Sequence, residues 1–279
     1  MSTQRLTGKV ALVTGAARGQ GRSHAARLAA EGADIIAVDV CRQLESVAYP
    51  MATTADFEET VAAVEATGRK IAAYQADVRD LGALQVAVDS GVSAFGRLDV
   101  VVANAGIASY APALELSELE FDEMVAVNLG GVWRTVRASV PHIKVGGEGG
   151  SVVITSSASG LRGIPNAAHY AAAKHGLVGL MKVLALEFGR DRIRVNTIHP
   201  TTVDTPMVQN DATLELFLPG RPDKTPEAFA RIAQQLNVIP VPWIQPETVS
   251  DLVVFLASDD AQYITGAAIP VDAGMAIRW

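Results

Sequence analysis

Cysteine is almost absent from the sequence: Cys41 is the only one among 279 residues. An internal disulfide is therefore excluded, and the chain suits a reducing compartment. No stretch reaches the roughly 18 apolar residues that a membrane span needs. The N-terminal MSTQRLTGKV also lacks the apolar core of a signal peptide. We therefore expect a cytoplasmic protein that does not enter a membrane.

Basic blocks and clusters of metal ligands are also missing. The net charge is −7 and no Lys/Arg-rich block is present, which disfavours a nucleic-acid partner. The five histidines are scattered, and His169 and His199 are interpreted as structural, so we expect no metal site. Internal repeats and low-complexity tracts are absent as well.

What the chain does contain is a regular alternation of short β-branched runs and longer helical patterns. Most of the runs are continuously apolar, which is typical of strands buried on both faces of a parallel sheet. We expect strands at residues 10–14, 34–39, 70–78, 98–106, 151–157, 193–200 and 267–272, and helices at about 20–31, 56–68, 81–95, 117–139, 168–188 and 246–257. This pattern predicts an α/β fold with a doubly wound parallel sheet and helices on both faces, in a single domain of residues 1–279. Ligands of such sheets bind beyond the carboxyl ends of the strands.

A glycine-rich turn, TGAARGQG at residues 14–21, follows the first expected strand. Gly15, Gly19 and Gly21 would let the backbone approach a diphosphate at the N-terminus of the next helix. Taken alone, the turn fits an ordinary strand-to-helix connection equally well. Asp39 adds to it, because it ends the second strand 18 residues after Gly21, where a carboxylate can bind both hydroxyls of a ribose. Together these features predict a dinucleotide site.

Asp39 also bears on which dinucleotide binds. A carboxylate repels the 2′-phosphate of NADP, so we expect NAD, although Arg18 and Arg42 would attract that phosphate. Asp77, near the end of the third strand, is placed to contact the adenine. The small residues of ANAG (103–106) would let a cofactor lie against the backbone, but each of these two features also fits an ordinary strand end.

The stretch SSASGLRGIPNAAHYAAAKHG (156–176) carries the candidate catalytic groups. Tyr170 and Lys174 are four residues apart and share one face of a helix, and Ser157 ends the preceding strand. A nearby ammonium favours phenolate, so Lys174 is expected to lower the pKa of Tyr170 and make it a general acid/base. Ser157 would hold the substrate oxygen. A solvated Tyr/Lys pair on a helix surface is the alternative interpretation.

Taken together, the glycine turn, Asp39 and the Ser157, Tyr170 and Lys174 set resemble the short-chain dehydrogenase/reductase family over residues 8–274. The resemblance implies a Rossmann-type seven-stranded sheet of order 3-2-1-4-5-6-7 and a homotetramer. It implies Asn128 as a fourth catalytic residue, holding a water between Lys174 and solvent. It also implies that Lys174 binds the nicotinamide ribose. Thr202 stands where the family commonly has a glycine. Including Tyr170 and Lys174, the expected cofactor contacts are Gly15, Arg18, Gly19, Gln20, Gly21, Asp39, Val40, Cys41, Asp77, Val78, Asn104, Ala105, Gly106, Pro200, Thr201, Val203, Thr205 and Met207.

The segment CRQLESVAYPMATTA (the insertion, residues 41–55) is far longer than the usual connection of about two to six residues. With HYAAAKHGLVGLMKVLALE and HPTTVDTPM, it resembles the mycofactocin-coupled, carveol dehydrogenase-like branch of the family. The branch implies that the insertion covers bound NAD, which exchanges poorly and is re-oxidised in place by mycofactocin, a peptide-derived redox carrier. The alternative is a surface Ω-loop without a role in cofactor retention.

Residues 205–244 (the lid segment) are rich in apolar side chains and contain no obvious arginine pair for a carboxylate. If the lid segment closes on substrate, an apolar secondary alcohol or its ketone is expected, and the branch suggests an alicyclic or terpenoid one. The alternative is that its apolar residues pack on the body or on another subunit. The expected substrate contacts are Ile107, Ser109, Leu161, Ile164 and Trp243.

Two other functions remain open from the sequence. An NADPH-dependent 3-oxoacyl-carrier reductase is disfavoured by Asp39 and by the insertion. A non-catalytic, dinucleotide-sensing regulator is disfavoured because it has no need for Ser157, Tyr170 and Lys174 together. The C-terminal MAIRW, ending in Trp279, is a candidate subunit contact.

Overall fold

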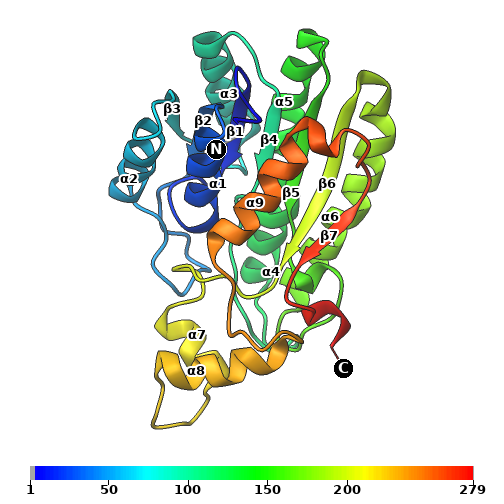
Figure 1. Ribbon diagram of the computed structural model, residues 1–279. Coiled ribbons are helices and arrows are strands. Elements are labelled where there is room, and N and C mark those ends of the chain that lie inside the picture. Colours follow the sequence, from blue (N-terminus) through cyan, green and yellow to red (C-terminus); the bar gives the residue numbers. More distant parts are fainter. Residues whose placement is uncertain (1–3, 279) are drawn as a thin grey trace.

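The computed structural model describes residues 4–278 and contains one sheet of seven parallel strands in the order β3-β2-β1-β4-β5-β6-β7 (Figure 1). The strands are β1 (Val10–Thr14), β2 (Asp34–Asp39), β3 (Ile71–Gln75), β4 (Val100–Ala103), β5 (Gly150–Thr155), β6 (Ile193–Pro200) and β7 (Ala268–Val271). The expected fold class, strand order and single Rossmann-type domain are confirmed. Trp279 lies outside the described residues.

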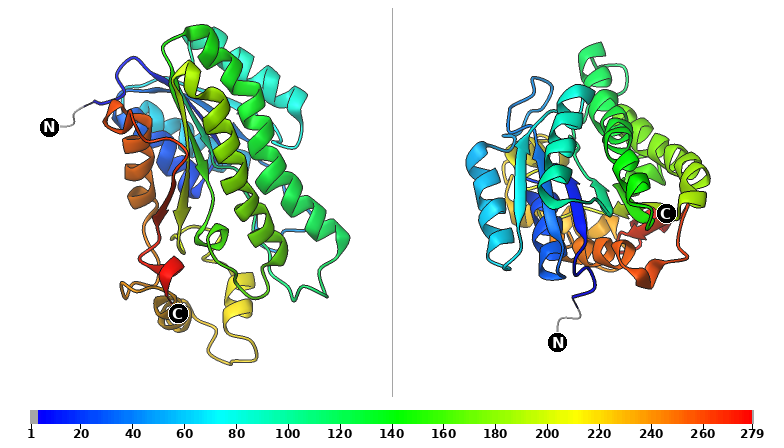
Figure 2. Two further views of the ribbon diagram at one scale, coloured as in Figure 1. Left: turned by 90° about the vertical axis from the view of Figure 1, so that its right-hand side faces the viewer. Right: turned by 90° about the horizontal axis from the view of Figure 1, so that it is seen from above.

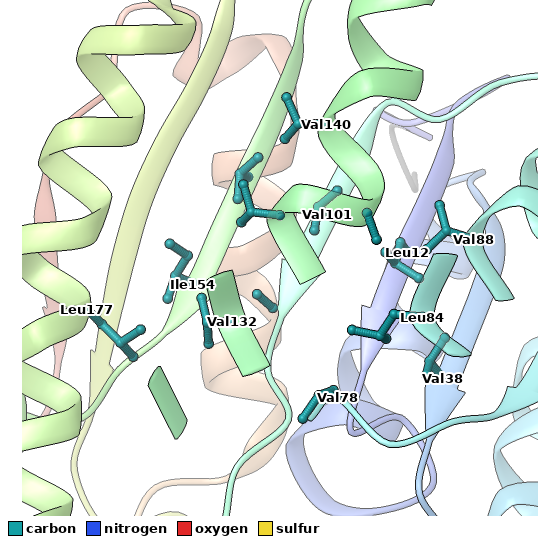
Figure 3. Close-up of a cluster of buried hydrophobic side chains, with 14 of the residues drawn as sticks. Leu12, Val38, Val78, Leu84, Val88, Val101, Val132, Val140, Ile154 and Leu177 are labelled. Atoms are coloured by element: carbon teal, nitrogen blue, oxygen red, sulfur yellow. The ribbon is translucent and has the colours of Figure 1, made fainter. Parts of the chain in front are cut away.

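Helices cover both faces of the sheet (Figure 2). One layer contains α1 (Gly19–Ala30), α2 (Thr54–Glu65) and α9 (Pro246–Ala257), and the other contains α3 (Leu81–Phe95), α5 (Val132–Gly146) and α6 (Ala168–Phe188). Because side chains alternate along a strand, each strand contributes to both cores. Figure 3 shows Leu12, Val101 and Ile154 of the sheet among the side chains of α3, α5 and α6.

Four of the seven expected strands are too long at their carboxyl ends. β3 ends at Gln75 instead of 78, β4 at Ala103 instead of 106, and β5 at Thr155 instead of 157. β7 ends one residue early, at Val271. The residues after β3, β4 and β5 leave the sheet and line cavities at its carboxyl edge. The run of apolar and small residues continues past the last hydrogen bond between neighbouring strands, so the sequence pattern alone overestimates the length of these strands.

The helix expected at 117–139 is two α-helices with a π-helical segment between them. These are α4 (Glu118–Val125), the π segment Ala126–Gly131 and α5, which continues to Gly146 despite Pro141. Such π segments are frequent at functional sites. Here the π segment contains Asn128, a candidate catalytic residue.

The lid segment contains two short helices for which we had no expectation, α7 (Asp211–Phe217) and α8 (Pro226–Ala233). They lie beyond the carboxyl end of β6, at the same end of the molecule as the C-terminus (Figure 1). Within residues 4–278, no helix has the length and apolar character needed to cross a bilayer.

Candidate active site

The glycine turn joins β1 to α1, and its glycines leave the backbone without side chains at the carboxyl edge of the sheet. A Cβ on Gly21 would lie 1.9 Å from the Gly15 carbonyl oxygen, and one on Gly15 would lie 2.8 Å from Ala105 Cα. Gly15 and Gly19 have φ of +67° and +54°, which glycine adopts without strain. No side chain caps the N-terminus of α1, so its first N–H groups stay available to an anion.

Asp39 is held at the end of β2 by main-chain donors. Ala17 N–H donates to Oδ2 at 2.9 Å and Cys41 N–H donates to Oδ1 at 3.1 Å. The carboxylate is buried, yet it borders the cavity over the glycine turn. Each oxygen keeps a lone pair for the hydroxyls of a ribose.

The two arginines that favoured NADP are both engaged elsewhere. Arg18 donates from Nη2 to the Pro50 carbonyl at 2.7 Å, and its guanidinium lies 5.9 Å from the centre of the Tyr49 ring. Arg42 lies 3.3 Å from the Asp77 carboxylate. Each guanidinium thus has a protein partner other than Asp39, so neither is free to bind a 2′-phosphate next to that carboxylate.

A cavity over the glycine turn (the turn cleft) brings together most of the expected cofactor contacts. Its lining includes Gly15, Arg18, Gly19, Gln20, Gly21, Asp39, Val40, Asp77, Val78, Asn104, Ala105, Gly106, Asn128, Tyr170, Lys174, Thr205 and Met207. Two buried oxygens of its lining, Gln20 Oε1 and Thr155 Oγ1, have no hydrogen-bond partner in the described structure. The glycine cradle, the uncapped helix and these unpaired oxygens all fit a dinucleotide.

Asp77 and Asn104 have partners that fix the edge of the turn cleft. Asp77 accepts hydrogen bonds from the Arg79 backbone and guanidinium. Burial alone would raise the pKa of the Asp77 carboxyl. The contacts with Arg79 and Arg42 outweigh burial, so the pKa is lowered. Asn104 donates from Nδ2 to the Thr14 carbonyl at 3.1 Å. The end of β4 is thereby tied to the glycine turn.

Ser157, Tyr170 and Lys174 come together at the carboxyl ends of β5 and β6. Lys174 is buried, its Nζ donates to the Thr155 carbonyl at 2.9 Å, and it lies 5.6 Å from the centre of the Tyr170 ring. Ser157 and Tyr170 both line the cavity at this edge of the sheet, and the Ser157 hydroxyl lowers the pKa of the Tyr170 phenol. The structure thus brings the three predicted residues together.

The net shift of the Tyr170 pKa has the opposite sign to the one expected. Burial is the largest influence and raises the pKa above 10, while the Ser157 hydroxyl lowers it only in part. Burial also lowers the Lys174 pKa to about 8. Desolvation penalises both the phenolate and the ammonium, and this accounts for the direction of both shifts.

A second cavity of about 340 Å³ (the lid cavity) adjoins the turn cleft, and Gln20, Ser156, Tyr170, Thr205 and Met207 line both. Its volume is in the range of sites for small organic molecules. Ser157 and Ile164 line it, together with Ala108, Tyr110, Val208, Phe217, Phe229, Leu236 and Met275. Tyr170 therefore lies where the two cavities meet.

Comparison with known proteins agrees with this geometry. A family model described as enoyl-(acyl carrier protein) reductase matches residues 15–276. The (−)-trans-carveol dehydrogenase of Rhodococcus erythropolis is 51% identical over 276 residues, covering 98% of this chain and 99% of the relative. The crystal structure of carveol dehydrogenase from Mycobacterium avium in complex with NAD has a TM-score of 0.97 at 50% identity, covering 98% of this chain and 99% of the other. The structure of a short chain dehydrogenase from Mycobacterium paratuberculosis bound to NAD has a TM-score of 0.91 at 43% identity, covering 98% and 100%.

The chain belongs to the short-chain dehydrogenase/reductase family. The predicted family and the predicted class of enzyme are thereby confirmed. The members compared match nearly the full length of the chain, so the insertion and the lid segment lie within the matched length.

Asn128, whose role came only from the family resemblance, is fully buried in the π segment. Its side chain forms two hydrogen bonds with the main chain of Ile107, accepting from N–H at 3.1 Å and donating to the carbonyl at 2.9 Å. A Cβ on Gly106 would lie 2.6 Å from Asn128 Oδ1 and 3.6 Å from Lys174 Nζ. Because residue 106 is a glycine, the Asn128 amide and the Lys174 ammonium can both lie next to its Cα.

Several expected residues of this short-chain dehydrogenase lie outside the turn cleft. Pro200, Thr201 and Val203 line the lid cavity, whereas the expected substrate residue Ile107 lines the turn cleft. Cys41 lines neither cavity and begins the insertion with φ of +42°. Thr202 is not among the described residues with positive φ, so its backbone does not require the glycine common in the family.

Ser109, Leu161 and Trp243, which we expected to touch substrate, line neither cavity. Ser109 Oγ pairs with His169 Nε2 at 2.8 Å. Trp243 stacks on Phe229 with ring centres 5.9 Å apart. It belongs to a small apolar core that the lid segment forms for itself from α7 and α8.

Sequence reasoning also missed two arginines that line the lid cavity. Arg162 Nη1 donates to the Met275 carbonyl at 2.8 Å and to the Arg278 carbonyl at 2.9 Å. Arg278 in turn donates from Nη1 to the Asn237 carbonyl at 2.5 Å. The Arg162 bonds fasten the C-terminal segment to the loop after β5, and the Arg278 bond fastens it to the lid segment. No spacing in the sequence indicates these roles.

Tyr49 of the insertion is a further residue that the sequence did not single out. It is buried, lines the turn cleft and packs into the main core with Leu44 and Val47. The insertion has no helical or strand periodicity that would mark Tyr49 as buried. The insertion thus contributes side chains to the site.

Proposed function

We propose that this protein is an NAD-dependent oxidoreductase that interconverts an apolar secondary alcohol, alicyclic or terpenoid, and its ketone. The observation that carries the proposal is the position of Tyr170, which lines both the turn cleft and the lid cavity. A phenol at that junction can exchange a proton with a substrate oxygen while the reacting carbon faces a cofactor.

The residues around Tyr170 divide the chemistry between them. Bound NAD supplies the hydride acceptor or donor. Tyr170 takes the hydroxyl proton of the alcohol during oxidation and returns it to the ketone oxygen during reduction. Ser157, which lines the lid cavity together with Tyr170, holds the same substrate oxygen. Lys174, fixed by the Thr155 carbonyl, stabilises the phenolate as it forms.

NAD is favoured over NADP by the arrangement of charge around Asp39. The buried carboxylate of Asp39 lines the turn cleft, where it would repel a 2′-phosphate, and Arg18 is directed to Pro50 of the insertion. Two similar solved structures, at 50% and 43% identity, contain NAD. The same features argue against the NADPH-dependent acyl-carrier reductase that the sequence left open.

The substrate class is supported by the lid cavity and by a relative. Ile164, Val208 and Phe217 give the cavity apolar walls beside Tyr170, and the R. erythropolis relative is named for carveol, an alicyclic terpenoid alcohol. A panel of alicyclic secondary alcohols, assayed with an artificial electron acceptor, tests this assignment. Turnover of straight-chain acyl thioesters in preference to the whole panel would overturn it.

We propose that the insertion retains NAD and that mycofactocin re-oxidises it in place. Leu44, Tyr49 and Met51 of the insertion line the turn cleft. Gln43 Nε2 bonds three carbonyls of the same segment, including that of Val47 at 2.8 Å, so the insertion is internally braced. Purification without added nucleotide, followed by mass spectrometry of the released ligand, is expected to yield NAD. An empty site would contradict retention, and NADP would contradict the cofactor assignment.

A further inference from the structure

The loop from residue 104 to 117 carries one wall of the lid cavity, and it is fixed at successive residues by different parts of the chain. Asn128 binds the main chain of Ile107. The hydroxyl of Tyr49 accepts a hydrogen bond from Ala108 N–H at 3.3 Å, and Ala111 N–H donates to the Asn166 carbonyl at 2.9 Å. Tyr49 is thus the point at which the insertion holds this loop.

Ala108 and its neighbour Tyr110 matter because they face the reacting groups. Both line the lid cavity, and the Tyr110 ring lies 6.3 Å from the Tyr170 ring. Ala108 is 7% exposed, so its N–H cannot reach bulk water without a shift of the loop. A buried donor that loses its acceptor is costly, which makes the Tyr49 bond a constraint on the position of this wall.

Other contacts hold the insertion in place without the Tyr49 hydroxyl. Arg18 binds the Pro50 carbonyl, the Ser46 hydroxyl binds Glu123, and Met51 N–H donates to Gln43 Oε1 at 3.0 Å. The Tyr49 ring packs in the main core, and burial raises the pKa of its phenol to about 12, so it stays protonated in any ordinary assay. The Tyr49 ring therefore packs in the core, while its hydroxyl oxygen accepts the hydrogen bond that holds the loop.

We propose that Tyr49 is a positioning residue for substrate: its hydroxyl fixes the Ala108–Tyr110 wall of the lid cavity beside Tyr170. The insertion then has a second task besides covering the turn cleft, which is to shape the alcohol site. The proposal rests on the proposed function only for the identity of the substrate, because the hold on the loop is a property of the chain itself.

The test is the Tyr49→Phe variant, which removes the hydroxyl and keeps the ring. Tyr263→Phe is the matched control, because Tyr263 is 90% exposed and contacts neither cavity. Amide hydrogen exchange of residues 104–112 is measured for wild type and both variants, with steady-state kinetics on the alcohol panel and the content of bound nucleotide.

For Tyr49→Phe we expect at least about tenfold faster exchange at the Ala108 amide and a rise in KM of about 3- to 10-fold, the scale of one lost hydrogen bond. kcat should stay within about twofold and the nucleotide content should not change, since removal of a uniform binding interaction acts on KM. Tyr263→Phe should match wild type in all three measurements.

Unchanged exchange at residues 104–112 would overturn the proposal, as would loss of bound nucleotide with unchanged KM, which would assign Tyr49 to the cofactor instead. If wild type oxidises no alcohol of the panel, the proposed function fails. In that event the exchange measurement still decides the proposal: faster exchange in Tyr49→Phe supports it and equal exchange refutes it.

Discussion

At the scale of single residues, the proton carrier is the group whose removal is most informative. Tyr170→Phe keeps the ring that lies between the two cavities but removes the hydroxyl. Turnover should fall about 10²- to 10⁴-fold, the usual contribution of a positioned acid/base. Bound nucleotide, measured by mass spectrometry, should be retained because the glycine turn and Asp39 are untouched. A variant with wild-type turnover would refute the role given to Tyr170.

The raised pKa of Tyr170 predicts opposite pH dependences for the two directions of the reaction. Oxidation needs the phenolate, and burial holds the phenol pKa above 10, so the oxidation rate should rise with pH across the neutral range. Reduction needs the protonated phenol, so its rate should hold at neutral pH and fall as the solution becomes alkaline. Initial rates from pH 6 to pH 10 in both directions check this. A falling oxidation rate over that range would show that another group controls the step.

The positions of the catalytic residues could be predicted from the sequence, but their energetics could not. The four-residue spacing of Tyr170 and Lys174 fixes a common helix face whatever surrounds it. The sign of the pKa shift depends on how deeply both groups are buried, and that burial comes from segments distant in sequence. Tyr49 escaped notice for the same reason, since its partner Ala108 is 59 residues away.

At the scale of elements, the contact between α1 and α9 contains a histidine that must stay neutral. His24 is fully buried, its Nδ1 pairs with the Ser250 hydroxyl at 2.8 Å, and its Nε2 has no partner among the described residues. Burial lowers the His24 pKa from 6.5 to about 3. The unfolded chain therefore binds more protons than the folded one between these values, and stability is lost as pH falls below 6.5.

His24→Gln should reduce this acid sensitivity. Between pH 7.5 and pH 5.0, wild type should lose about 1–2 kcal/mol more unfolding free energy than the variant, because one unit of pKa shift corresponds to about 1.4 kcal/mol. Urea titrations of both proteins at the two pH values measure the difference. Other titrating groups cancel in the comparison, so equal losses would mean that His24 does not carry the effect.

Elements of the sheet were easier to predict than those of the lid segment. Continuous apolar runs mark strands such as β1 and β6 because both faces are buried by helices. The π segment at Ala126–Gly131 has no distinct composition, so one long helix was expected there. Helices α7 and α8 are short and stabilise each other through Phe217, Phe229 and Trp243, a contact that local patterns do not encode.

At the scale of the whole molecule, the parallel sheet is what assembles the site. Residues from the ends of β1, β2, β4, β5 and β6 reach one edge because all strands point the same way. The insertion follows β2, and the lid segment follows β6, so both extend from that same edge. The site is thus closed by two segments that are far apart in sequence, which explains why the sequence predicted the catalytic set better than its walls.

The family resemblance implies a homotetramer, and we propose that the outer surface of α5 and α6 forms part of the subunit contact. Val145 of α5 and Val183 and Leu186 of α6 are apolar side chains that are 89%, 51% and 83% exposed, and we propose that the subunit contact covers them. Native mass spectrometry of wild type should give four times the chain mass, and Leu186→Glu should shift the population to smaller species, because it would place a charge in the proposed contact. Val86→Glu, at a residue 68% exposed on α3, is the matched control and should remain tetrameric. A tetramer that tolerates Leu186→Glu would exclude this part of α6 from the subunit contact, and a monomeric wild type would exclude the assembly itself.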